Sequence, residues 1–192
     1  METLPVLKTK SLILIPAAPK LTRRVLEYYL RNKAFLEPFE PKKSSNFFTE
    51  EAQRENLRFE AHSTEEARSY RYYITLHEDA DAIIGSITLS DVVRGAFWSS
   101  FLGYKLDERL QGLGYMTEAV SCMTEFGFET IGLHRIEANV MPRNKPSLRV
   151  LEKCGYEPEG LAKRYLKING VWEDHIHMVR LNEEENEPAF CR

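Results

Sequence analysis

The chain has 192 residues, of which 43% are hydrophobic and 29% are charged, and its formal net charge is −3. One domain with a substantial core fits this length, and the slight negative charge gives no general electrostatic basis for binding DNA, RNA or an anionic membrane. The cysteines lie far apart at Cys122, Cys154 and Cys191, which argues against a disulfide framework and a structural zinc site. Neither a signal peptide nor a membrane-spanning run is apparent, so we expect a cytoplasmic protein.

A strand and a helix open the predicted fold. Ser11–Ile15 is a short apolar strand that is stopped by the prolines after it. Thr22 is a candidate N-cap for a helix that runs to about Lys33. The residues that this helix is expected to bury are Val25, Leu26, Tyr29 and Leu30.

A linker rich in proline and phenylalanine follows over residues 35–48. Thr49 and the two acidic residues after it start a second helix, which we expect to end near His62. Two strands come next, Arg71–Leu76 and Ala82–Leu89, joined by a polar turn. Apolar and polar residues alternate in the second strand, which indicates that one of its faces is buried.

The second half of the chain continues the alternation of strands and helices. Trp98–Leu106 is a strand of aromatic, apolar and small residues, and a glycine-rich stretch leads from it into a helix over Thr117–Ile131. His134–Val140 alternates in polarity and predicts another strand. Asn144 is placed to cap a short helix that ends at Gly155.

The last predicted element is a hairpin of Tyr165–Ile168 and Val171–Leu181 around the turn Asn169-Gly170. We therefore expect a mixed α/β domain of the α+β kind over residues 1–182, with largely antiparallel strands rather than a doubly wound sheet. A polar, acidic tail follows over residues 183–192.

The glycine-rich stretch, Gln111–Ala119, is the most informative part of the sequence. A loop that leads from a strand into a helix start exposes amides without an intrahelical partner, and these suit phosphate oxygens. The stretch lacks the spacing of a P-loop and of a dinucleotide-binding loop. It predicts a phosphorylated cofactor, with a tight turn that binds nothing as the alternative.

Within that stretch, Gln111, Gly114 and Met116 resemble the Gln/Arg-x-x-Gly-x-Gly/Ala signature of the GNAT acetyltransferases. The chain further resembles the RimJ/RimL branch of this family, and most of all its RimJ type, over about residues 11–181. The supporting segments are Phe35–Pro41, Asp91–Gly95, His134–Ile136, Asn144–Ser147, Leu151–Tyr156 and Asn169–His175. The resemblance implies the GNAT fold, a mostly antiparallel mixed sheet flanked by helices.

The same resemblance implies acetyl-CoA as co-substrate and no metal. In the family the loop amides bind the pyrophosphate, and main-chain groups of the preceding strand bind the pantetheine arm. The implied contacts are Leu106, Asp107, Gln111, Gly112, Leu113, Gly114, Tyr115, Met116, Asn144 and Ser147. Met116 departs from the family pattern, which has glycine or alanine at this position. Its thioether would narrow the approach to the helix start.

Direct attack of an amine on a thioester needs a neutral amine, a donor to the developing oxyanion and a proton for the thiolate. By resemblance, Ser147 would give the proton, Tyr104 would lie beside the thioester, and Glu40 would hold or deprotonate the amine. The implied acceptor contacts are Phe39, Glu40, Tyr165 and Asp174. Each residue also has a structural alternative, such as a plain N-cap at Asn144.

An α-amino group has a pKa of about 7.7–8.0, against about 10.4 for lysine, so on the order of 10% of α-amines are uncharged at neutral pH. Together with the resemblance, this predicts acetylation of a protein N-terminus, that of a small-subunit ribosomal protein beginning with alanine. Two alternatives stay open: a free small amine such as a polyamine, amino acid or aminoglycoside, and a CoA-liganded protein that binds the ribosome without turnover. A homodimer is compatible with the sequence.

Three other features suggest chemistry less strongly. His175 and His177 share a strand face, but no third ligand has convincing spacing for a metal. Cys154 next to a glycine invites a covalent mechanism, although its place on an apolar stripe favours core packing. Glu118 falls in the first turn of its helix, where an anion stabilises the helix start.

Overall fold

The computed structural model describes residues 4–183, so the predicted acidic tail from 184 onward and Cys191 lie outside the described residues. These residues form one eight-stranded sheet in the order β1-β2-β3-β4-β5-β6-β8-β7. All neighbours are antiparallel except β5 and β6, which are parallel. The strands are β1 Leu7–Lys8, β2 Leu12–Pro16, β3 Tyr70–Leu76, β4 Gly85–Val93, β5 Ser99–Leu106, β6 Arg135–Val140, β7 Glu157–Ile168 and β8 Val171–Leu181.

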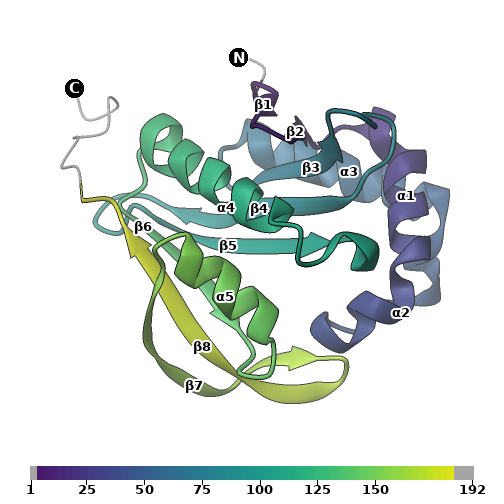
Figure 1. Ribbon diagram of the computed structural model, residues 1–192. Helices are drawn as coiled ribbons and strands as arrows, with labels where there is room; N and C mark the ends of the chain where they lie inside the picture. Colours follow the sequence, from purple (N-terminus) through teal and green to yellow (C-terminus); the bar gives the residue numbers. More distant parts are fainter. Residues whose placement is uncertain (1–3, 184–192) are drawn as a thin grey trace.

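Helices cover both faces of this sheet (Figure 1). α4 and α5 pack on one face through the larger apolar core, and α1 and α3 pack on the other through a smaller cluster that includes Tyr73. The main helices are α1 Thr22–Arg31, α2 Lys33–Leu36, α3 Glu50–Glu65, α4 Tyr115–Glu125 and α5 Lys145–Lys153. Short 3-10 turns occur at Pro19–Leu21, Glu37–Phe39, Ser45–Phe48 and Glu108–Leu110, and α4 continues into a π-helical turn at Phe126–Ile131. The expected α+β architecture is confirmed.

A predicted helix start at Thr49 and a predicted cap at Asn144 are both present. The hydroxyl of Thr49 accepts a hydrogen bond from the amide of Ala52 at the start of α3, at 3.3 Å. The side chain of Asn144 accepts one from the amide of Ser147 at the start of α5, also at 3.3 Å. Both residues satisfy an amide that the first turn of a helix leaves without a partner.

The cap predicted at Thr22 is wrong. A 3-10 turn over Pro19–Leu21 leads directly into α1, so Thr22 is already helical and its hydroxyl donates to the Pro19 carbonyl at 2.6 Å. The buried stripe of α1 is also different from the prediction, because Leu26 is only half-buried and Leu30 is exposed. Its buried residues include Val25, Tyr28 and Tyr29, whose i, i+3, i+4 spacing marks one helix face.

The hairpin is longer than predicted, because β7 begins at Glu157. Its turn agrees with the prediction: Asn169 and Gly170 both have positive φ, 42° and 86°, as a two-residue turn between twisted strands requires. The pairing of β7 with β8 is irregular between Ala162 and Leu166. There the amide of Arg164 donates to the carboxylate of Asp174 at 2.8 Å.

β5 and β6 are paired over a short distance only. Their pairing covers Ser99–Phe101 of β5 and Arg135–Glu137 of β6. Beyond Phe101, β5 has β4 as its one neighbour strand within residues 4–183. The sheet therefore splits at this point, and one edge of β5 faces the opening between the two strands.

Candidate active site

The glycine-rich loop joins β5 to α4 at this split. Gly112 and Gly114 have φ values of 76° and 88°, a region that side chains strongly disfavour, and Gly114 is the N-cap of α4 without a side-chain cap. Within residues 4–183, no hydrogen-bond acceptor meets the amides of residues 112–117. Free amides at the positive end of a helix form an anion site, so this geometry fits the predicted phosphate contact.

Met116 does not obstruct the loop. Its side chain is 6% exposed and lies in the apolar core beneath α4, among residues such as Ala119 and Val120. The thioether therefore points away from the surface at which the amides are displayed. The narrowing that the sequence suggested at this position does not occur.

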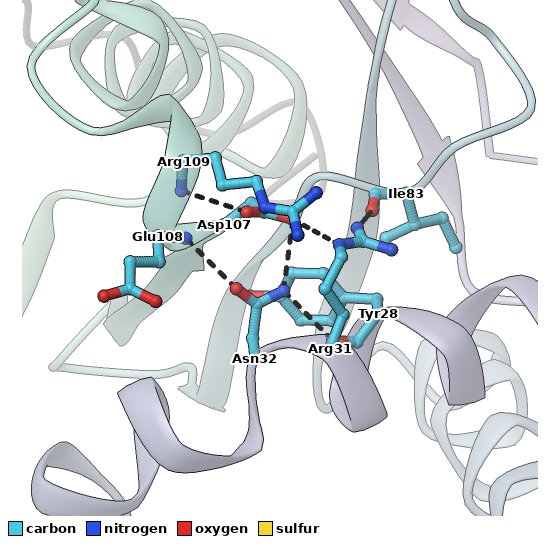
Figure 2. Close-up of polar contacts among 7 residues, drawn as sticks. All are labelled: Tyr28, Arg31, Asn32, Ile83, Asp107, Glu108 and Arg109. Carbon is cyan, nitrogen blue, oxygen red and sulfur yellow. Dashed lines mark hydrogen bonds and ion pairs between the residues drawn. The ribbon is translucent and has the colours of Figure 1, made fainter.

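A polar cluster holds the start of this loop (Figure 2). The carboxylate of Asp107 accepts hydrogen bonds from Arg31 Nε at 2.6 Å, from Asn32 Nδ2 at 3.2 Å and from the Arg109 amide at 3.0 Å. The side-chain oxygen Oδ1 of Asn32 in turn accepts from the Glu108 amide at 3.1 Å. The end of α1 is thus fastened to the segment between β5 and α4, and we call this arrangement the Asp107 cluster.

The charge of Asp107 is stabilised although its side chain is only 6% exposed. Burial works against ionisation, but the hydrogen bonds and the Arg31 charge outweigh it and hold the pKa of this carboxyl below its usual value. Asp107 is therefore an anion at neutral pH. The contribution of Asp107 to the stability of the fold comes mainly from its ion pair with Arg31, and removing the carboxylate would leave Arg31 without this partner.

The amide of Asp107 is already occupied, because it donates to the Ile84 carbonyl on the β4 side at 2.7 Å. The cofactor contact implied at Asp107 stays a prediction for the other atoms of this residue. Main-chain groups along a strand point alternately to its two edges. Leu106 and Tyr104 consequently direct their amides and carbonyls toward the split, where a ligand can reach them.

Tyr104 and Ser147 lie together on the α5 side of the split. The phenol oxygen of Tyr104 is 2.8 Å from the Ser147 hydroxyl and donates to the Ser147 carbonyl at 3.1 Å. Burial raises the pKa of Tyr104 well above its usual value, against the smaller opposing effect of Ser147. Two protonated hydroxyls are therefore held side by side, next to the helix start that Asn144 caps.

Glu40 lies on the opposite face, where Lys105 of β5 also points. Its carboxylate is paired with both Lys105 and Lys43. Burial works against ionisation of Glu40, but Lys105 and then Lys43 outweigh it and lower its pKa. A carboxylate with two ammonium partners is a poor proton acceptor, which weighs against the deprotonating role that the resemblance implied.

The segment around Glu40 lies against the tip of the hairpin. The Glu40 carbonyl accepts from the Asn169 amide at 2.9 Å. Arg143 donates to the Pro38 carbonyl at 3.1 Å and to Glu173 at 2.8 Å. A pocket beside this contact is lined by residues that include Tyr29, Lys33, Lys42, Lys43 and Phe48.

The other predicted acceptor residues are more scattered. Phe39 lies below the Arg143 guanidinium, 5.8 Å from ring centre to Cζ. Tyr165 packs its ring against His177, with 4.8 Å between centroids. Asp174 supports the irregular part of the hairpin, where its carboxylate accepts from the Arg164 amide.

Several site residues were missed by the sequence reasoning. Lys105 could have been found, because it is a charged residue within an otherwise apolar strand end. Arg31 and Asn32 gave no such signal, since a polar pair at a helix end is ordinary and their partner Asp107 is about 75 positions away. Lys43 belongs to a linker whose path the sequence does not predict.

The remaining candidates have structural roles or unrelated partners. Glu118 accepts hydrogen bonds from the Thr9 hydroxyl and the Ser11 amide, so it ties the N-terminal strands to α4. Burial raises the pKa of the Cys154 thiol, whose sulfur contacts the Thr117 carbonyl at 3.4 Å. Within residues 4–183 no three His, Cys, Asp or Glu side chains are grouped as metal ligands, and no helix has the length and apolarity to cross a bilayer.

Comparison with known proteins identifies the family of this chain. The family model described as an acetyltransferase (GNAT) domain matches residues 11–157. The chain is 38% identical over 181 residues to the Probable N-acetyltransferase YjcK of Bacillus subtilis, covering 94% of this chain and 99% of that protein. It is 36% identical over 153 residues to the [ribosomal protein uS5]-alanine N-acetyltransferase of Escherichia coli, covering 80% and 78%.

A solved structure is also similar. The RimJ of Mycobacterium smegmatis, in complex with CoA-disulfide, superposes with a TM-score of 0.84 at 29% identity, covering 93% of this chain and 85% of that one. The chain therefore belongs to the GNAT acetyltransferase family. It is an N-acetyltransferase whose relatives include ribosomal-protein alanine N-acetyltransferases.

We expect Asp107→Asn to lower the free energy of unfolding by about 2–4 kcal/mol, because Arg31 loses its buried carboxylate partner. Acetyl-CoA affinity should fall as well, since the loop start is no longer held. Urea denaturation and calorimetry measure the two effects. Glu108→Gln is the matched control, because that side chain is exposed; equal losses in both variants would contradict the role of the Asp107 cluster.

The same carboxylate makes stability depend on acid pH. A pKa lower in the folded than in the unfolded state contributes stability above the unfolded value of about 3.9, and this is lost as pH falls through the folded pKa. The free energy of unfolding should therefore drop below about pH 4, and less steeply in Asp107→Asn. Urea melts between pH 3 and 7 compare the slopes; identical slopes would show that Asp107 does not contribute.

Proposed function

We propose that the protein transfers the acetyl group of acetyl-CoA to the N-terminal α-amino group of a protein, most specifically a small-subunit ribosomal protein that begins with alanine. The observation that carries this proposal is the split beside β5, with free loop amides at one end and the Tyr104–Ser147 hydroxyl pair beside it. The choice of acceptor is supported by the 36% identity to the uS5-alanine enzyme. A ribosomal acceptor would place the reaction in the cytoplasm.

The residues present fit acetyl-CoA as a substrate. The unpaired amides of residues 112–117 and the start of α4 would bind its pyrophosphate, with Gln111 at the edge of the loop. Main-chain groups of Tyr104 and Leu106 would bind the pantetheine arm, because they face the split. Asn144 and Ser147 at the start of α5 would contact the arm from the other side.

Tyr104 and Ser147 would act on the leaving sulfur. The thiolate departs readily, because a thiol of pKa about 8.5 is only a weak base when ionised. A donated hydrogen bond is therefore enough, and the raised pKa of Tyr104 makes its phenol a donor that stays protonated. Ser147 can pass a proton along the same contact.

The acceptor would approach from the opposite face, where the Glu40 carbonyl contacts the hairpin at Asn169. The lysines around Glu40 make this face unfavourable for a polyamine or an aminoglycoside, which carry several positive charges. An α-amine carries at most one charge and is partly neutral at pH 7. These charges favour a protein N-terminus among the amines considered.

The direct test is transfer of labelled acetyl from acetyl-CoA to a lysate that lacks its own N-terminal acetyltransferases, followed by mass spectrometry. Label on the α-amine of a ribosomal protein beginning with alanine is the expected result. Label on small amines alone would contradict the proposed acceptor. No transfer despite acetyl-CoA binding would contradict the enzymatic function.

Gly114→Asp should abolish acetyl-CoA binding, because its carboxylate would face the phosphates. Gly114→Ala suffers the same backbone strain at φ 88° without the charge, so the difference between the two variants isolates electrostatic repulsion. Calorimetry with acetyl-CoA measures both. Gly95→Asp, at another open glycine of positive φ, is the control for stability; unchanged binding in Gly114→Asp would refute the loop assignment.

Ser147→Ala should lower kcat by roughly 10- to 100-fold. This loss is smaller than the usual loss for an oxyanion donor, because a weakly basic thiolate needs less stabilisation. The acetyl-CoA Kd should change by less than about threefold. Tyr104→Phe should have a similar effect, and the double variant should lose less than the product, since the two hydroxyls act as a pair. Ser121→Ala on α4 is the control. Equal changes in kcat and Kd would make Ser147 a binding residue.

A further inference from the structure

A histidine and a carboxylate face the acceptor side of the split and have no part in the scheme above. On β6, Ala138 is in the core, so Glu137 and Asn139 point to the opposite face. His177 of β8 is the register partner of Asn139 and shares that face. Nδ1 of His177 lies 2.6 Å from Oε1 of Glu137.

Their position in the sheet is the apex of the split. Glu137 pairs with Phe101 in the last rung that joins β6 to β5. Two and four residues further along β5, Gly103 and Lys105 lie on the same face, beside the segment that carries Glu40. Side chains at this apex are therefore directed to where an acceptor amine would approach a thioester held along β5.

The hydrogen bond to Glu137 determines which nitrogen of His177 can react. A carboxylate accepts, so Nδ1 carries the proton and Nε2 keeps its lone pair when the ring is neutral. Within residues 4–183 Nε2 has no partner, and the side chain is 24% exposed. Glu137 is itself held by Arg135 at 2.9 Å. A base oriented by a second group is the arrangement that proton transfer requires.

Asn139 provides an independent indication of a ligand. Its side-chain oxygen Oδ1 is buried and, among the described residues, has no hydrogen-bond partner. A buried acceptor without a donor is costly unless a ligand or water completes it. An ammonium group beside His177 has N–H bonds for both Nε2 and this oxygen.

We propose, on the basis of the function above, that His177 is the general base of the transfer, that Glu137 positions it, and that Asn139 accepts a hydrogen bond from the acceptor amine. One ammonium proton goes to Nε2. The nitrogen lone pair then forms the bond to the thioester carbon, and the C–S electron pair leaves with sulfur. The second proton lost from nitrogen neutralises the thiolate, and the imidazolium returns its proton to water.

This division places acid–base groups on opposite faces of one opening. The base lies on the face of Glu40 and Lys105, and the hydroxyl pair lies on the face of α5. The amine and the leaving sulfur thus meet different groups, as direct attack in a ternary complex needs. The charged and titratable groups around His177 are Glu137 and Arg135 from β6, Glu159 and Tyr165 from β7, and His175 of β8.

The test is the pH dependence of kcat/KM for an alanine-initiated peptide, with wild type and His177→Gln. Wild type should keep most of its kcat/KM at pH values below the pKa of the amine, about 7.7–8.0, since it uses the charged amine. His177→Gln should follow the neutral amine, rising through about pH 7.7–8.0. Its deficit should be on the order of 100-fold at pH 7 and shrink strongly by pH 9.

Further variants separate this role from a structural one. Glu137→Gln should give a smaller deficit with the same pH trend, because the ring loses its carboxylate but keeps a polar neighbour. Asn139→Ala should raise the peptide KM with an unchanged acetyl-CoA Kd; a raised acetyl-CoA Kd instead would assign Asn139 to the cofactor. His134→Gln, an exposed histidine beside β6, and thermal unfolding of every variant are the controls.

The outcomes distinguish the two proposals. Suppose that wild type is active and that His177→Gln is folded. If the variant then has no deficit in kcat/KM, or the same deficit at pH 7 and pH 9, the role of His177 alone is overturned. A wild type that binds acetyl-CoA and acetylates no peptide would overturn the proposed function, and this inference with it. A deficit confined to low pH is the result that supports both.

Discussion

The separation of β5 from β6 after three residue pairs determines where the candidate active site can form. Their pairing ends at Phe101 and Glu137, so the remaining edge of β5 presents main-chain donors and acceptors in the middle of a sheet. Unpaired backbone groups in a protein interior are rare, because each costs about as much as a lost hydrogen bond. A ligand with amide groups could form main-chain hydrogen bonds with this edge as a neighbouring strand would, and the pantetheine arm of acetyl-CoA contains such amides.

The alternation of side chains along β5 then gives the opening two different surroundings. Tyr104 points to α5 and meets the Ser147 hydroxyl, while the next residue, Lys105, points to α1 and meets Glu40. The split therefore has neutral donors on one face and a charged surface on the other. The chemistry of each face follows from the two-residue period of a strand.

The loop at the end of β5 depends on a contact that is distant in sequence. The Asp107 cluster ties it to the end of α1, and the chain continues from Asn32 directly into α2 and the segment of Glu40. The glycine-rich loop and the proposed acceptor side are therefore attached to the same stretch of chain. A buried carboxylate with three donors is a stable attachment, because removing any one partner leaves charge or polar groups unpaired.

Local chemistry made much of this fold predictable. Several strands followed from alternation, the start of α3 from Thr49 and the acidic residues after it, the cap of α5 from Asn144, and the hairpin turn from Asn169-Gly170. The N-cap at Thr22 failed, because a preceding 3-10 turn extends the helix backward and only packing decides which stripe of α1 is buried. Glu40 was placed correctly in a loop, but its pairing with Lys43 and Lys105 depends on how that loop packs against β5.

The order of the elements, the glycine loop and its family resemblance can be read from the sequence alone, since these depend on residues that are neighbours along the chain. The split, the Asp107 cluster and the pairing of Tyr104 with Ser147 and of His177 with Glu137 become apparent in the folded molecule. The members of these pairs lie 43 and 40 positions apart. Whether such residues meet depends on strand register and on how helices pack across the sheet, which no local pattern encodes.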